Sequence, residues 1–145
     1  MKKFFLIVLL IMCGSCSTAY ASNIVTVGEA KGYRYVVDLE TIKQMKDGEI
    51  TSVFEMIPIT TQTKKDVIKL ADNKPAVKII STIYFDEMFE WYFIGNKKLV
   101  DSKNNVLREI KNVYKKSKFM LIREDTIIMN MKEIVFEEGA NLYGD

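Results

Sequence analysis

Carboxylates are the main side chains of this sequence that could carry out acid–base chemistry, and they include three adjacent pairs: Asp86-Glu87, Glu124-Asp125 and Glu137-Glu138. A general acid and a general base must converge on one substrate. Neighbours in a strand point to opposite faces, so the first pair is not expected to meet. The second pair fits a helix N-terminus, where negative charge is favourable, and the third fits a solvated tail. We therefore expect structural roles, whereas a cleft with two buried carboxylates would indicate an enzyme.

Other catalytic and metal-binding groups are scarce. The chain has no histidine, and its two cysteines, Cys13 and Cys16, precede the expected mature start. Most transition-metal sites, and thiol or imidazole catalysis, therefore lack their groups. The glycines do not form a phosphate-binding loop before a helix, and residues 101–105 lack the glycine and the final glutamate of an EF-hand loop. We expect no cofactor, no metal ion and no enzymatic activity.

Aromatic side chains between positions 85 and 93 are the best candidates for a binding surface. Alternation along a strand places Phe89, Trp91 and Phe93 on one face and Tyr92 on the other. One face is expected to pack on a C-terminal helix, and the other to present Tyr92 with Tyr33 or Tyr35 as a flat patch. Such aromatics are enriched at protein interfaces, although core packing is the competing explanation for most of them.

The charge balance argues against nucleic acid as a partner. The chain has 21 Lys and Arg against 19 Asp and Glu, and Lys2 and Lys3 lie in a leader, which leaves 19 of each. A neutral domain lacks the excess of cationic side chains that displaces phosphate counterions. The clusters Lys64-Lys65 and Lys115-Lys116-Lys118 could contact an anionic partner, or they could be solvated loops.

The N-terminus predicts export. A cationic start, an apolar run over residues 4–12 and the small residues of Ala19-Tyr20-Ala21 indicate a signal peptide over 1–21, cleaved after Ala21. The apolar run has nine residues, whereas a membrane-spanning helix needs about 20, so no membrane span is expected. Acylation of Cys16 as a lipid anchor is the alternative. We expect a location in the cell envelope, on the cell surface or outside the cell.

The mature chain, residues 22–145, predicts one domain of the α+β class. Alternating patterns indicate a twisted antiparallel sheet of about six strands. Apolar residues three and four apart indicate a C-terminal helix, near residues 126–136, packed on one face of the sheet and ending at Gly139. Asp38 is expected to cap a short helical turn, Gly95-Asn96 to form a hairpin turn, and residues 60–75 to be a mobile excursion with one short element over 67–71. The strands are expected at 23–27, 32–38, 49–57, 76–85, 87–94, 97–100 and 106–110.

Three segments resemble the surface-adhesin E-like family of small exported bacterial proteins: residues 35–42 (YVVDLETI), residues 85–107 with FDE, WYF and DSKNNVL, and residues 122–127 (IREDTI). The resemblance implies an antiparallel sheet with a packed helix and a non-catalytic, surface-exposed role in binding host proteins. Family members often carry a cysteine after the Asp of the FD segment and another after the last helix. Here the corresponding positions are Glu87 and a residue near Phe136, so the stapling disulfide is missing.

The sequence therefore predicts an exported, non-catalytic and adhesin-like binding module. Its expected partner is a protein, either a host extracellular protein or an envelope component. The candidate contact residues are Tyr33, Tyr35, Tyr92, Lys64 and Lys65. The alternative is a structural protein that contacts another component of the cell envelope.

Overall fold

The computed structural model describes residues 23–143. The expected signal peptide, its cleavage site at Ala21 and the alternative lipid anchor at Cys16 lie outside the described residues. Within the described range, no helix is both long and apolar enough to cross a membrane.

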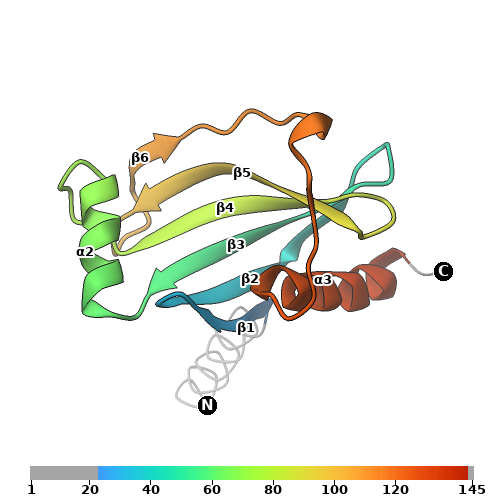
Figure 1. Cartoon of the computed structure of the whole chain (residues 1–145), viewed down its shortest axis with the longest axis horizontal. Helices are drawn as coiled ribbons and strands as arrows, with labels where there is room; N and C mark the ends of the chain where they lie inside the picture. Colours follow the sequence, from blue (N-terminus) through green and yellow to red (C-terminus); the bar gives the residue numbers. More distant parts are fainter. Residues whose placement is uncertain (1–22, 144–145) are drawn as a thin grey trace, which may run out of the picture.

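The described residues form one curled antiparallel sheet in which six strands follow each other in chain order (Figure 1). The short strand β7 pairs with β5 next to its start, so β5 is flanked by β6 at one end and by β7 at the other. This meander confirms the predicted α+β fold class. The strands are β1 (Ile24–Ala30), β2 (Tyr33–Gln44), β3 (Ile50–Pro58), β4 (Lys78–Phe85), β5 (Trp91–Val100), β6 (Val106–Ile110) and β7 (Met120–Leu121).

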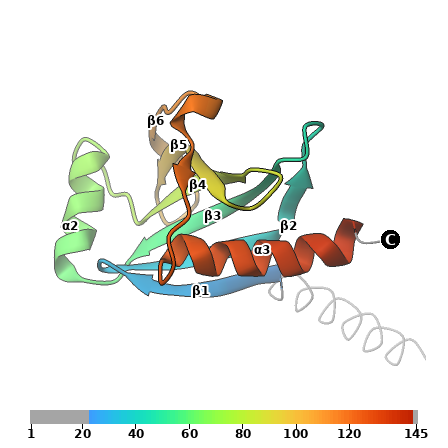
Figure 2. The same ribbon diagram turned by 45° about the vertical axis from the view of Figure 1, so that its right-hand side comes forward.

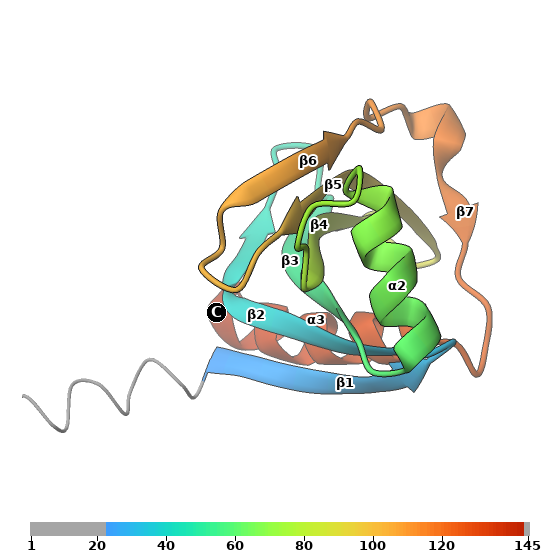
Figure 3. The same ribbon diagram turned by 90° about the vertical axis from the view of Figure 1, so that its left-hand side faces the viewer.

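Two helices pack on the inner face of the curl. Helix α3 (Ile127–Tyr143) runs along β1 and β2, and α2 (Thr61–Leu70) lies at the other end of the sheet (Figures 2 and 3). A single 3-10 turn, η2 (Lys116–Lys118), interrupts the connection between β6 and β7. The predicted C-terminal helix packed on one face of the sheet is therefore confirmed, whereas the expectation that Tyr92 lies on the opposite face is wrong, because Tyr92 packs against the core under α3.

The core on the inner face has two parts. Met131 and Val135 of α3 are fully buried against Val37, Phe54 and other residues of the first cluster. The second cluster lies under α2 and contains Val67, Ala71, Ala76, Ile79 and Leu99. Met56 of β3 contacts both clusters, which places the two helices on the same side of the sheet.

The outer face carries a separate aromatic cluster. Tyr84 and Phe93 are paired residues of β4 and β5, and their strand neighbours point into the inner core. The chain between β6 and β7 folds over them, so that Tyr114 and Phe119 pack on Phe93 with ring centroids 5.7 and 5.8 Å away. This segment covers part of the outer face with aromatic rings.

The helical turn expected after Asp38 is wrong, because β2 continues to Gln44. Asp38 does accept a hydrogen bond from the backbone of Glu40, as a cap would. However, the pairing of β2 with β3 has a register shift between Asp38 and Lys43. There the Thr41 hydroxyl donates a hydrogen bond to the Asp38 carbonyl and accepts one from the backbone N–H of Val53. Strand β2 therefore continues through a β-bulge at this point.

The single short element expected over 67–71, within a polar excursion over 60–75, is corrected, because Thr61–Leu70 form helix α2. Thr60 accepts from the backbone N–H of Thr63, and Thr63 accepts from the backbone N–H of Thr60, which makes a capping box. The Thr63 hydroxyl also donates to the carbonyl of Gly32 at 2.8 Å. These bonds tie the helix start to the β1–β2 turn.

Two glycines have roles that differ from the prediction. Gly95 lies inside a continuous strand β5, where a Cβ atom would meet the Tyr84 ring at 3.3 Å, so its role is close packing rather than a turn. Gly139 does not end α3, which continues to Tyr143. It faces Ile42 and Ile50 of the sheet, where a Cβ atom would make ordinary van der Waals contacts at 3.9 and 3.8 Å.

Candidate functional site

Two of the three predicted contact tyrosines meet in a groove on the inner face. Tyr35 of β2 and Tyr92 of β5 line a pocket of about 590 Å³ beside the N-terminus of α3. Its wall is mostly apolar and includes four charged groups. The lining residues are Glu29, Ala30, Lys31, Tyr35, Phe54, Met56, Tyr92, Ile94, Lys97, Asp125, Thr126, Ile127, Ile128 and Asn130.

The groove tyrosines are half-buried, and each has a raised pKa. Burial raises the pKa of Tyr35, with a smaller contribution from Tyr33. Burial also raises the pKa of Tyr92, although Arg123 opposes the shift. Tyr35 stacks on Phe54 with ring centroids 6.5 Å apart, which fixes its orientation. Both hydroxyls therefore stay protonated at neutral pH and can donate hydrogen bonds at the edge of an apolar surface.

The other candidate residues lie elsewhere. Tyr33 packs against the cluster beneath α2, where burial and the Asp66 carboxylate raise its pKa. Lys64 and Lys65 are exposed on α2. The flat patch expected from Tyr92 with Tyr33 or Tyr35 is corrected to a recessed groove, because Tyr92 points to the face that α3 covers.

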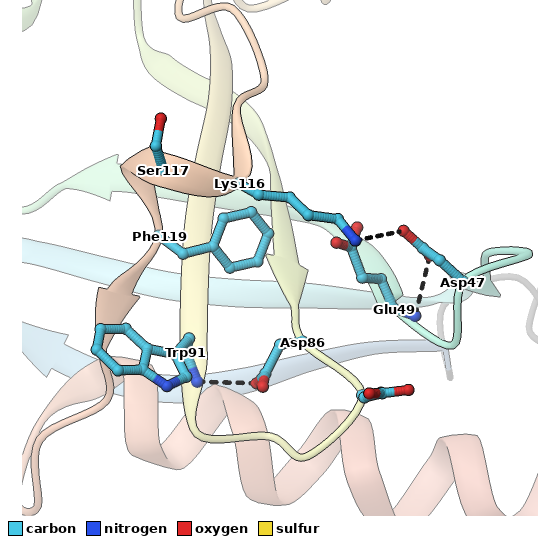
Figure 4. Close-up of a pocket in the computed structure, with 8 residues that line it drawn as sticks. Asp47, Glu49, Asp86, Trp91, Lys116, Ser117 and Phe119 are labelled. Atoms are coloured by element: carbon cyan, nitrogen blue, oxygen red, sulfur yellow. Dashed lines mark hydrogen bonds and ion pairs between the residues drawn. The ribbon is translucent and has the colours of Figure 1, made fainter.

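A second pocket lies at one end of the outer face, and sequence reasoning missed it. It has a volume of about 440 Å³ and combines four carboxylates with two aromatic rings (Figure 4). Its residues come from three separate places in the chain: the β2–β3 turn, the β4–β5 connection and the segment around η2. They are Asp47, Glu49, Asp86, Glu87, Trp91, Lys116, Ser117 and Phe119.

The connection between β4 and β5 explains why two adjacent carboxylates share this pocket. Asp86 and Glu87 lie in a turn, where side chains do not alternate between faces as they do in a strand. Asp86 accepts hydrogen bonds from the backbone N–H groups of Glu90 and Trp91, both at 2.8 Å. The expectation that the pair points to opposite faces is therefore wrong. The same turn gives Phe89 a positive φ of 55° and directs its ring into the inner core, away from Trp91.

Glu49 is the most buried charged group of the pocket. The residue is 6% exposed, and its Oε1 accepts a hydrogen bond of 2.5 Å from the Tyr114 hydroxyl. Desolvation raises the pKa of Tyr114, and the hydrogen bond and the charge of Glu49 raise it further. The tyrosine therefore stays neutral and holds the segment between β6 and β7 against the start of β3.

The carboxylates of this pocket do not form a buried acid–base pair. Of its four carboxylates only Glu49 is buried, and Asp86 is occupied by backbone N–H groups. The cleft with two buried carboxylates that would indicate an enzyme is therefore not formed here. Within residues 23–143, no group of three or more His, Cys, Asp or Glu side chains is placed to hold a metal ion.

No protein-family model, curated protein or solved structure matches this chain. The resemblance to the surface-adhesin E-like family therefore stays a prediction. The structural features that bear on function are the two pockets.

Proposed function

We propose that this chain is an exported, non-catalytic binding module, adhesin-like in role, whose partner is a protein. The observation that carries the proposal is the inner-face groove, which brings Tyr35 and Tyr92 together beside α3. Small sites of this kind combine an apolar wall with a few polar groups that fix orientation. The export and the adhesin-like role come from the leader sequence and the family resemblance.

The occupant that best fits the groove is an apolar side chain of a protein partner, flanked by polar contacts. Ile94, Ile127 and Ile128 supply apolar wall, and the tyrosine hydroxyls supply donors. Tyrosines with an apolar body and a polar tip are favoured at such contacts. The groove has a balanced formal charge, because it is lined by two cations, Lys31 and Lys97, and by two anions, Glu29 and Asp125. Selectivity toward an acidic or a basic segment of the partner is therefore not expected there.

The test is a binding screen of the purified protein against immobilised extracellular proteins and glycans, with two variants. Tyr92→Ala removes a groove ring, whereas Tyr33→Ala removes a tyrosine of the α2 cluster and is the matched control. We expect at least one purified protein to bind. The Tyr92→Ala variant should bind it about tenfold more weakly, and Tyr33→Ala should bind it like the wild type, provided circular dichroism finds both variants folded.

Binding to no extracellular protein, or equal binding by the two variants, would overturn this proposal. Protease shaving of intact cells distinguishes a host extracellular protein from an envelope component as the partner. Cleavage on living cells supports a host protein as the partner, whereas protection until the envelope is opened contradicts the adhesin-like role and favours an envelope component.

A further inference from the structure

The inner-face groove does not end at Tyr92. A second hollow of about 440 Å³ lies beside it and shares three of its lining residues, Tyr92, Thr126 and Ile128. We call this hollow the groove extension; it is lined by Tyr92, Met120, Leu121, Arg123, Thr126 and Ile128. Its walls come from β5, from β7 and from the start of α3. The groove and its extension therefore form one continuous surface.

The groove extension is mostly apolar and borders an open strand. Met120 and Leu121, the two residues of β7, are 50% and 54% exposed. Within the described residues β7 pairs only with β5, so its other edge has no strand beside it (Figure 3). Single exposed apolar side chains are common, whereas neighbouring ones beside a cavity mark a surface that a partner covers. An extended segment of a partner can lie along such an edge.

Arg123 is the one charged residue among the described residues that line the groove extension. Its guanidinium forms no ion pair and no hydrogen bond with a side chain of residues 23–143, although Glu124 and Asp125 follow it in the sequence. Its charge acts on the Tyr92 hydroxyl, since it opposes the rise of the pKa of that tyrosine. The guanidinium therefore lies near the Tyr92 hydroxyl and can still bind an anion.

The charge of the groove extension differs from that of the groove. The groove is lined by two cations and two anions, whereas the extension adds one cation and no anion. A guanidinium can bind a carboxylate through two parallel N–H···O hydrogen bonds, which are stronger than those of a neutral donor. The Tyr92 hydroxyl can donate a hydrogen bond as well. The extension is therefore complementary to a carboxylate beside an apolar group.

We propose that the segment of the protein partner that fills the groove carries an Asp or Glu residue beside its apolar side chain, and that this carboxylate binds Arg123. The inference rests on the proposed function, because the apolar side chain is the one assigned there to the groove. Neighbouring cavities of this size are each less than about 10 Å across, which an extended chain spans in about three residues. The acidic residue is therefore expected within about three positions of the apolar one.

A displayed library of random peptides, selected on the immobilised purified protein, supplies the probe. We expect the wild type to enrich peptides with Asp or Glu within about three positions of Leu, Ile, Val or Phe. The Arg123→Gln variant should enrich apolar peptides without this acidic residue. The matched control is Lys103→Gln, which makes the same charge change in the β5–β6 turn. It should enrich the same peptides as the wild type.

A double-mutant cycle with one enriched peptide tests the contact itself. Changing the acidic residue of the peptide to its amide should weaken binding to the wild type about fivefold, and Arg123→Gln should weaken binding of the acidic peptide by a similar factor. The amide peptide should bind Arg123→Gln as tightly as it binds the wild type, because the contact is already lost. The same peptide change weakening both proteins equally would overturn the inference, since independent changes add.

The inference and the proposed function fail on different results. Enrichment of apolar peptides without an acidic preference would overturn the inference and leave the groove as the binding site. Enriched peptides that bind Tyr92→Ala as tightly as the wild type would contradict both, because Tyr92 lines both cavities. Enrichment of no peptide would also overturn the inference, and a stable dimer in sedimentation would then assign the open edge of β7 to a second copy of the chain.

Discussion

Replacing Tyr114 by phenylalanine removes the hydroxyl that donates to Glu49 and keeps the ring of the aromatic cluster. The loss leaves Oε1 of a buried carboxylate without its partner. A hydrogen bond to a charged group contributes about 1.5–3 kcal/mol. Because the Tyr114 side chain is 37% exposed, water can partly replace the hydroxyl, and we expect a loss of about 1–2 kcal/mol.

Urea unfolding followed by tryptophan fluorescence measures this loss. A decrease of about 1.5 kcal/mol in the free energy of unfolding corresponds to a midpoint lower by about 5 °C in a thermal scan of a domain of this size. Tyr92→Phe is the matched control, because the Tyr92 hydroxyl has no hydrogen-bond partner among the described residues. That variant should change the free energy of unfolding by less than about 0.5 kcal/mol.

The pH dependence adds a second readout. The pKa of Tyr114 is raised in the folded protein, so above the ordinary tyrosine value of about 10 the unfolded chain loses the proton before the folded chain does. The contribution of Tyr114 to stability is fully present below pH 10 and is lost as the pH rises toward its folded pKa. The stability difference between the wild type and Tyr114→Phe should therefore shrink above pH 10. An unchanged difference, or a Tyr114→Phe variant as stable as Tyr92→Phe, would refute the role of the Tyr114–Glu49 bond.

Three further substitutions test the elements that hold the two pockets, all by urea unfolding. Thr60→Ala removes the capping box of α2 and should cost about 1 kcal/mol; Thr61→Ala at the exposed next position should cost less than half of that. Met131→Ala empties a fully buried site of α3 and should cost about 2–5 kcal/mol, and a smaller cost would mean that α3 packs loosely. Gly48→Ala places a Cβ 3.1 Å from that of Glu87 at a φ of +87°. It should cost about 1–2 kcal/mol, and an unchanged free energy of unfolding would mean that the turn accepts a side chain there.

The sheet and α3 could be predicted because their patterns depend on simple periodicity. In α3, residues at three- and four-residue spacing are the ones that meet the sheet, and Met131 and Val135 are fully buried. The strands β3 and β4 lie close to their predicted positions. Helix α2 was missed because threonines fill its start and it buries little more than Thr63 and Val67. Helix α2 is amphipathic, but its sequence is polar overall and offers few apolar residues to mark a helical face, and the cap bonds contribute to its stability.

The candidate sites were predicted only in part, and the reason is topological. Tyr35 and Tyr92 were found because strand alternation gives them a common face. The outer-face pocket joins residues from three distant segments, and its key pair, Asp86 and Glu87, lies in a turn that was read as part of a strand. One signal was present: Trp91 and the carboxylates at 86 and 87 lie within six positions of the sequence. Side chains alternate between faces only in a strand, so the alternating pattern could not show that Asp86, Glu87 and Trp91 line the same pocket.

The division of the core into two clusters has a consequence for how the molecule opens. Helix α2 is attached through Thr63, Val67 and Ala71, whereas α3 packs along β1 and β2 over most of its length. Parts of a protein with few buried contacts open at lower free energy than the whole. Amide protons of α2 should therefore exchange with deuterium sooner than those of β3, β4 and α3. Partial opening would then expose the end of the sheet that α2 covers, while both pockets stay intact.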